Sequence, residues 1–538
     1  MFMTKSNSIS TQQISGYINL LWCPNKIYGT GSIVASLRRI SSELDFTKLV
    51  KSTVQIILLK SQILVDFIER ICYVTIQYLL TNTFKEATCQ EPAKTRNATL
   101  HVKTIDRHLG QVNLDKIAQN SKFYQRTPQK ITAFAFVKSL CNAAYQEIFS
   151  YSKVAFLLGL LGVDISKQAV AERINRHGVV FVKQVLNAVI ENISGLCSTY
   201  NTGVFKTFVN VFLQDSTHLP LPPHLADAYP GAKNQSKKIN AGMKIQAIFN
   251  LVNERLTAFS LSPFTRTDQS ASKDILKLVK TGDLVIRDLG YFVLSVFETF
   301  IQNGIFFLTR YRNEVTIYCP ESGNKLNLLK LLKKKSSLDI DVFLGSNQRL
   351  PVRLVALPVP DHIANERRRK AKNNRDRRCN PSKESLQLLG WSIFVTNVGR
   401  SIWEPSNILE VYAIRWRIEI IFKAWKSHLS LDKIPQSVNK NELEVYIYAH
   451  LLNITFFHVF FDQLNRYMIR KHNKHISMLK IAPLFDQITN YIFLFGATFD
   501  SEQDENFLEK LILRHCCYEE RIKRSNYSEQ LARLGCLA

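Results

Sequence analysis

The sequence predicts a mixed α/β fold flanked by helical regions. Short runs rich in β-branched and aromatic residues alternate with amphipathic segments between about 204 and 312. Apolar residues three and four apart dominate the stretches before and after this part, which is the helical period. A length of 538 residues is enough for several domains with large cores.

The charge of the chain indicates a polyanionic partner. Lys and Arg number 70 and Asp and Glu number 44, so the formal net charge is 70 − 44 = +26. Such a surplus favours nucleic acid over a membrane surface as the partner. The ten cysteines are scattered apart from adjacent Cys516 and Cys517 and show no zinc-binding spacing, which is typical of inert thiols in a reducing cytoplasm.

No segment predicts secretion or a membrane span. The first residues lack an apolar run after a basic start. Residues 54–80 are apolar but carry four charged side chains, and residues 446–461 are shorter than the ~20 that a span requires. Both read as buried helices, so we expect a soluble protein that has no membrane partner.

The first 203 residues predict two regions. Residues 1–112 form an extension of unknown function, with an amphipathic helix over 46–82 and a polar linker after it. Residues 113–203 form a helical DNA-binding region, in which an apolar helix, a tight turn and a basic helix resemble a helix-turn-helix. Its expected DNA contacts are Lys167, Gln168, Arg173 and Arg176. An ordinary helical hairpin with a solvated polar face explains the pattern equally well.

Residues 204–312 predict the first part of a catalytic core. A strand over 205–215 ends in Asp215 and is followed by the turn-like STHLPLPP. The expected elements that follow are strands at 243–252 and 254–263, a helix at 270–280, a strand ending in Asp288, a helix at 291–302 and a strand at 305–312. Three strands, a helix, a strand, a helix and a strand, completed by a late helix, is the order of an RNase H-like fold.

Residues 313–390 predict a small β-rich insertion with strands in NEVTIYC, DIDVFLG and QRLPVRLVALPVP. A basic run follows them at 366–378. Its eight cations would repel one another unless phosphate neutralises them, so we expect DNA contact there. They are Arg367, Arg368, Arg369, Lys370, Lys372, Arg375, Arg377 and Arg378.

Residues 391–430 complete the core with a strand and one helix over about 403–426, and residues 431–538 form a C-terminal helical region. At about 100° per residue, four side chains of the helix share an arc of ~60°. They are Tyr412, Arg415, Glu419 and Lys426. Arg415 and Glu419 could simply form a surface pair, but a carboxylate beside two cations also suits a metal-and-phosphate site.

The spacing of these four residues, within YAIRWRIEIIFKAWK, resembles the YREK signature of the insertion-sequence family four transposases, which are DDE enzymes. QDST around Asp215 and RDLGYF around Asp288 are also similar to that family, and the resemblance covers roughly residues 115–530. It implies that Asp215, Asp288 and Glu419 are catalytic and bind two Mg²⁺ ions, which Mn²⁺ can replace. Tyr412, Arg415 and Lys426 would then hold DNA phosphates, with Lys423 as a helper.

The same resemblance implies cut-and-paste transposition of a bacterial insertion sequence. Such a protein would bind double-stranded DNA, both the terminal inverted repeats and the target, in the cytoplasm and on the nucleoid, and would act as a homodimer in a paired-end complex. A nuclease that cleaves without joining is one alternative, although it has no evident need for a phosphate-binding set. A second alternative is a transposase-derived DNA-binding protein without activity, which the presence of all three carboxylates disfavours.

Overall fold

A computed structural model describes residues 106–126, 130–145, 149–194, 202–232, 240–333, 335–373, 380–485, 502–519 and 525–536. The predicted helix at 46–82 and nearly all of the N-terminal extension lie outside these residues.

One nine-stranded sheet organises the described chain, in the order β3-β2-β1-β4-β5-β9-β8-β7-β6. The neighbours β1, β2 and β3 are antiparallel, whereas β4 runs parallel to β1 and β5 parallel to β4. The strands are β1 (Val211–Leu221), β2 (Ala241–Asn250), β3 (Arg255–Pro263), β4 (Leu284–Arg287), β5 (Phe306–Arg310), β6 (Ile317–Tyr318), β7 (Leu338–Leu344), β8 (Leu350–Pro358) and β9 (Trp391–Thr396). The element order predicted for residues 204–312 is therefore present, and β6, β7 and β8 extend the same sheet through β9.

The helices fall before, between and after these strands. Before the sheet lie α5 (Leu114–Asn120), α6 (Ala133–Tyr145), α7 (Tyr151–Leu160), α8 (Lys167–Arg173) and α9 (Arg176–Ser194). Among the strands lie α10 (Asp268–Ala271), η3 (Ser272–Lys277), η4 (Leu289–Tyr291), α11 (Leu294–Gln302), α12 (Leu328–Leu332), α13 (Asp361–Lys372) and α14 (Lys383–Leu388). After it lie α15 (Pro405–Ile414), α16 (Trp416–Ser427), α17 (Lys440–His472), α19 (Glu502–His515) and α20 (Tyr527–Arg533).

Strand β1 is longer than predicted. It continues past Asp215 through the segment that reads as a turn, and it stays paired with β2 as far as Leu221 opposite Ala241. The turn prediction was wrong because it relied on prolines. Pairing with β4 ends at Gln214, so the second edge of β1 has no strand beyond it, and proline is tolerated on such an edge. Asp215 therefore lies within β1, at the point where β4 stops.

The helix predicted over 403–426 is two helices, α15 and α16, with Arg415 between them. The Arg415 N–H bonds to the Tyr412 carbonyl and the Ile418 N–H to the Arg415 carbonyl, which are i to i−3 bonds that tighten the chain locally. Sequence periodicity does not reveal this change because the residues on both sides keep a helical pattern. The joint places Arg415 at the start of a helix rather than in the middle of one.

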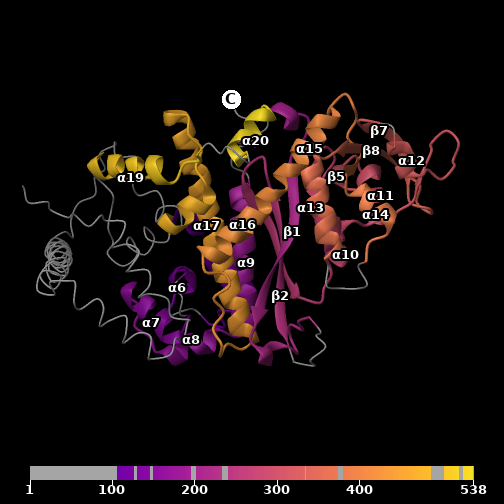
Figure 1. The fold of residues 1–538 in the computed structure, drawn as a ribbon. Coiled ribbons are helices and arrows are strands. Elements are labelled where there is room, and N and C mark those ends of the chain that lie inside the picture. The colour runs from indigo at the N-terminus through magenta and orange to yellow at the C-terminus, as the bar shows by residue number, and fades with distance from the viewer. Residues whose placement is uncertain are drawn as a thin grey trace, which may run out of the picture. The chain divides into compact units, whose positions relative to one another are not determined.

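Two hydrophobic cores lie on opposite faces of the sheet (Figure 1). Leu213 of β1 and Ile286 of β4 belong to the core that includes α9, α16 and α17. Phe212 and Val285, one residue earlier on each strand, belong to the core formed with η3 and α11. This alternation follows from the two-residue period of a strand and decides which face every other β1 and β4 side chain meets.

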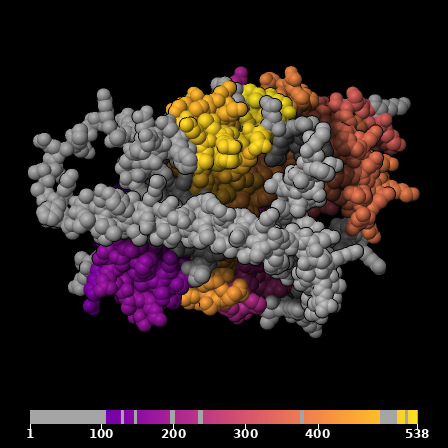
Figure 2. Space-filling model, turned by 60° about the vertical axis from the view of Figure 1, so that its left-hand side comes forward, coloured from indigo at the N-terminus to yellow at the C-terminus, as the bar shows by residue number. Residues whose placement is uncertain are grey.

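Helix α17 is the central helix of the first core. It is the one helix in the described part of the chain that is long and apolar enough to cross a membrane, but 94% of its apolar window is buried inside the protein. It packs against α6 and α9, which links the N-terminal helices to the sheet. The C-terminal residues, yellow in Figure 2, and the indigo N-terminal helices both reach the surface on the face shown there.

Two buried polar contacts hold α16 in place. The Trp425 indole N–H donates to His458 Nε2 of α17 at 3.2 Å. Arg417 forms an ion pair of 2.8 Å with Glu254 at the β2–β3 turn, and both side chains are 2% exposed. Tyr527 of α20 donates to the same carboxylate at 2.6 Å. No sequence pattern predicts the Arg417–Glu254 pair, because its members are 163 residues apart.

We predict that stability falls as the pH drops below about 6.5. Burial lowers the pKa of His450 to about 3 and, with Arg417 nearby, that of His458 to about 3. Because the unfolded chain binds these protons near pH 6.5 and the folded chain does not, stability is present above 6.5 and is lost toward 3. Each histidine contributes a slope of up to about 1.4 kcal/mol per pH unit.

Urea unfolding at pH 7.5, 6 and 5 measures this slope. His458→Phe should flatten it, whereas His362→Gln, at an exposed position, should leave it unchanged. A slope that is identical in all three proteins would refute the assignment.

We predict that Arg417→Met lowers the free energy of unfolding by about 3–5 kcal/mol, because it leaves the Glu254 carboxylate buried without its cation. Arg312→Met is the control: its ion pair with Glu314 is 36% and 78% exposed, and such pairs contribute about 0–1 kcal/mol. Equal losses in the two variants, measured by urea denaturation, would contradict the prediction.

Candidate active site

The sheet brings Asp215 and Asp288 together. Parallel pairing of β1 with β4 places Gln214 opposite Arg287, and the two aspartates are the next residues on each strand. Since side chains alternate along a strand, both aspartates lie on the face of Leu213 and Ile286, toward α16. The prediction that Asp288 follows the fourth strand is confirmed, and Asp288 also caps η4.

Arg415 lies among three carboxylates. Its Nη2 is 2.6 Å from Glu419 Oε1, its Nη1 is 3.4 Å from Asp215 Oδ2, and its Nε is 3.9 Å from Asp288 Oδ1. The Tyr412 hydroxyl donates to Asp288 Oδ1 at 3.5 Å. The three predicted carboxylates therefore converge on one guanidinium, although they come from β1, the end of β4 and α16.

Burial decides the protonation of Asp215. It raises the pKa of this carboxyl to about 7; the Ser216 N–H and Arg415 oppose the rise, and the neighbouring Asp288 and Glu419 add to it. Burial likewise raises the pKa of Tyr412 to about 12, so its phenol stays a hydrogen-bond donor at neutral pH. A carboxylate in this position requires a nearby positive charge to stay ionised.

The donor set suits a divalent metal ion. Carboxylate oxygens are the ligands that Mg²⁺ prefers. Asp215, Asp288 and Glu419 all lie within 4 Å of one positively charged group, the Arg415 guanidinium. Among the described residues no three acidic, histidine or cysteine side chains already lie close enough to hold a metal ion. The three carboxylates instead share contacts with the Arg415 side chain.

Lys426, the last of the four residues predicted to share one helix face, and its predicted helper Lys423 lie further along α16. Lys426 Nζ donates to the His218 carbonyl of β1 at 2.8 Å, three residues beyond Asp215, and Lys423 is exposed. Despite the joint at Arg415, three of the four residues contact β1 or the residue after β4, and Glu419 is joined to them through Arg415. The three are Tyr412, Arg415 and Lys426.

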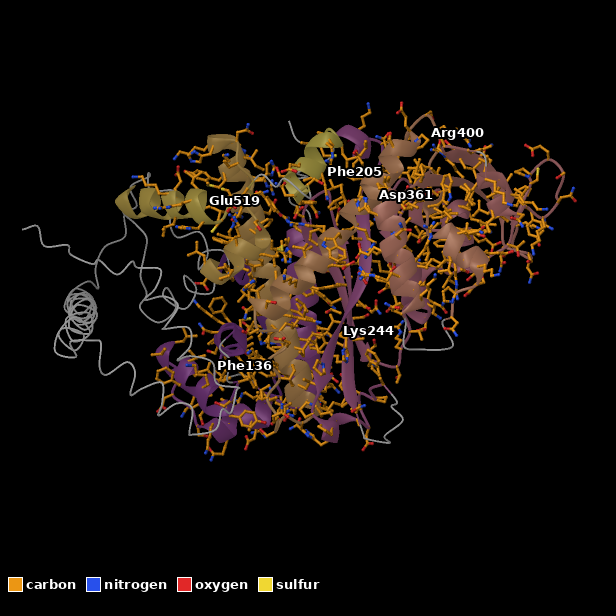
Figure 3. The ribbon with its side chains drawn as sticks, in the orientation of Figure 1. Phe136, Phe205, Lys244, Asp361, Arg400 and Glu519 are labelled. Atoms are coloured by element: carbon orange, nitrogen blue, oxygen red, sulfur yellow. The ribbon has the colours of Figure 1, made fainter. Side chains whose placement is uncertain are left out.

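Two neighbours of the site were not predicted. Asp268 Oδ1, in α10, accepts a hydrogen bond from Ser216, the residue after Asp215 on β1. It also accepts hydrogen bonds from Lys244 and Gln246 of β2, and Figure 3 labels Lys244. Arg310, at the end of β5, holds its guanidinium 5.6 Å from the centre of the Tyr412 ring. Neither residue stands in a distinctive motif. Asp268 is brought here by the packing of α10 against β1 and β2, and Arg310 by the pairing of β5 with β4.

The basic run begins in α13. Arg367 donates to Trp391 and Ser392, Arg368 donates to Leu386 and Asn365, and Lys370 pairs with Glu366. Arg369 and Lys372 are exposed. Arg375, Arg377 and Arg378 lie outside the described residues.

Three of the four residues expected to contact DNA from the helical region before the sheet are exposed. Lys167 and Gln168 are exposed on α8, while Arg173 donates to the Ala169 carbonyl of its own helix. Arg176 is exposed at the start of α9. Helix α8 stops at Arg173, and α9 begins at Arg176 and continues through Gly178.

Known proteins similar to this chain share one function. Residues 207–454 match the family described as "Transposase DDE domain". The transposase for insertion sequence element IS231D of Bacillus thuringiensis subsp. finitimus is 27% identical over 72% of this chain and 84% of its own length. The transposase for IS1151 of Clostridium perfringens is 22% identical over 68% of this chain and 81% of its own length.

The cryo-EM structure of the piggyBac transposase synaptic complex with hairpin DNA aligns with 82% of this chain at 10% identity and a TM-score of 0.37, a likeness too distant to define the fold. The family match covers β1, β4 and α16 together, so all three convergent carboxylates lie within it. Residues 207–454 of the chain therefore match the transposase DDE domain, and most of the chain is similar to transposases of bacterial insertion sequences.

Proposed function

We propose that this transposase excises and inserts its own element by cut-and-paste transposition, with Asp215, Asp288 and Glu419 as the catalytic carboxylates. The observation that carries the proposal is the convergence of these three side chains on the Arg415 guanidinium, from β1, the end of β4 and α16. The strand order β3-β2-β1-β4-β5 with a late helix supports an RNase H-like core, and β6 to β8 with α13 form its β-rich insertion.

The carboxylates would hold two Mg²⁺ ions, or Mn²⁺, which supply an activated water or 3′-hydroxyl and stabilise the leaving oxygen of an in-line phosphodiester attack. Arg415 now forms ion pairs with all three carboxylates. Once metal ions bind the carboxylates, the N–H donors of the Arg415 guanidinium would become available to a DNA phosphate. Tyr412, which keeps its proton at neutral pH, would donate to the same backbone from the Asp288 side.

Lys426, with Lys423 beside it, extends the proposed phosphate contacts along β1. Exposed Arg369 and Lys372 of α13 and the basic face of α8 are further candidates for double-stranded DNA, both inverted repeats and target. The net charge of +26 supports such a partner on the bacterial nucleoid. We further propose that two copies pair the element's ends.

A transposase-derived DNA-binding protein without activity is the second candidate. Loss of a carboxylate or its displacement from the others would favour it. All three are retained and lie against one side chain.

We predict that Glu419→Gln abolishes both cleavage and joining of a labelled DNA carrying the element's ends in Mg²⁺, because the amide cannot replace a carboxylate as a metal ligand. DNA binding, measured by mobility shift, should persist. Glu442→Gln, at the start of α17, is a control that should retain activity. Binding without reaction in wild type and variant alike would support the inactive relative instead.

We predict that the double variant Arg369→Ala, Lys372→Ala weakens DNA binding regardless of sequence. Each lost phosphate contact should reduce the slope of log K against log salt by about 1, so the double variant should lose up to about 2. Lys277→Ala, Lys330→Ala removes two exposed lysines from other helices and serves as the control. A slope unchanged in the α13 variant, measured by fluorescence anisotropy between 50 and 300 mM salt, would exclude α13 as a DNA contact.

A further inference from the structure

The residues immediately before the two aspartates form a buried pair on the opposite face of the sheet. Gln214 and Arg287 are register partners in the parallel pairing of β1 with β4. The Arg287 Nη2 donates to Gln214 Oε1 at 2.5 Å, and the two residues are 0% and 2% exposed. Since Asp215 and Asp288 are the next residues, this bond joins the two strands one residue before the site.

A third element fixes the pair. Arg287 donates to the Ser272 hydroxyl at 2.7 Å and to the Ser272 carbonyl at 2.9 Å, and Gln214 donates to the Ala271 carbonyl at 3.3 Å. Ala271 ends α10 and Ser272 begins η3. The helical segment on the far face is thereby tied to both strands at the level of the aspartates.

The guanidinium occupies this position at an energetic cost. No carboxylate in the described part of the chain forms an ion pair with Arg287, and its Nε has no hydrogen-bond partner there. Burial lowers the pKa of Arg287 to about 9, which still leaves it charged at neutral pH. An apolar side chain of similar volume would avoid the desolvation penalty, so stability alone does not explain an arginine here.

We propose that Arg287 and Gln214 are positioning residues, which set the separation and orientation of the Asp215 and Asp288 carboxylates for metal binding. The inference rests on the proposed function of those aspartates. Rotation or sliding of β4 against β1 would move Asp288 relative to Asp215, and the Arg287–Gln214–Ser272 bonds resist that movement. Partners of this kind, behind the metal ligands, commonly affect metal affinity about 10- to 100-fold when they are removed.

The test is a titration of the full-length chain with Mg²⁺ and, separately, Mn²⁺, in which the thermal unfolding midpoint is followed without DNA. The measured quantity is the metal concentration at which the unfolding midpoint has risen by half of its maximal increase. Arg287→Met should raise this half-saturating concentration by about 10- to 100-fold. Cleavage of the element's ends should require correspondingly more metal.

Arg255→Met is the matched control, because Arg255 is also a buried arginine, paired with Asp462 far along the chain. It should lower the midpoint without metal and leave the half-saturating metal concentration unchanged. Gln214→Leu, a milder change should Arg287→Met fail to fold, should shift that concentration in the same direction.

A titration of Arg287→Met or of folded Gln214→Leu that superimposes on wild type would overturn the inference, as would an equal shift in Arg255→Met. Failure of the proposed function gives a different result: wild type and Asp215→Asn would then show the same metal response.

Discussion

The parallel pairing of β1 with β4 is the constraint on which the site depends. It places the residues after Gln214 and Arg287 side by side, and the alternation of side chains turns both aspartates toward α16. A shift of one residue in this register would send one aspartate to the opposite face, because every side chain of a strand changes face with such a slip. The chemistry therefore begins with backbone hydrogen bonds.

Helix α16 supplies the third carboxylate, and its position is fixed by polar contacts buried on its other sides. Trp425 bonds to His458 of α17, and Arg417 pairs with Glu254 beyond the end of β2. These contacts are costly to break because each would leave a buried polar group unpaired. Glu419 consequently faces Asp215 from a rigid element, which is what a metal site with defined geometry requires.

Arg415 has two relations to this site. It neutralises carboxylates that would otherwise repel one another in a buried setting, and burial already raises the pKa of Asp215. Its place at the joint between α15 and α16 lets one side chain reach β1, β4 and its own helix. Metal ions could take over the contacts of the carboxylates, and a phosphate could take over those of Arg415. The observed arrangement is therefore what a site would show before metal and DNA bind.

The sequence alone predicted the resemblance to transposases, the element order of the core and the three carboxylates that the structure brings to Arg415. Those features are local: the four-residue stripe follows from helical spacing, and Asp288 follows directly on a short apolar strand. Two predictions from the sequence were wrong. The length of β1 was underestimated because the prolines do not reveal that one edge of the strand is unpaired. The 403–426 helix was predicted as continuous because helical periodicity does not reveal the tighter hydrogen bonds around Arg415. Only the tertiary structure decided that Arg417 meets Glu254, that Ser216 bonds to Asp268 and that Gln214 bonds to Arg287, because such contacts join residues 52 to 163 positions apart.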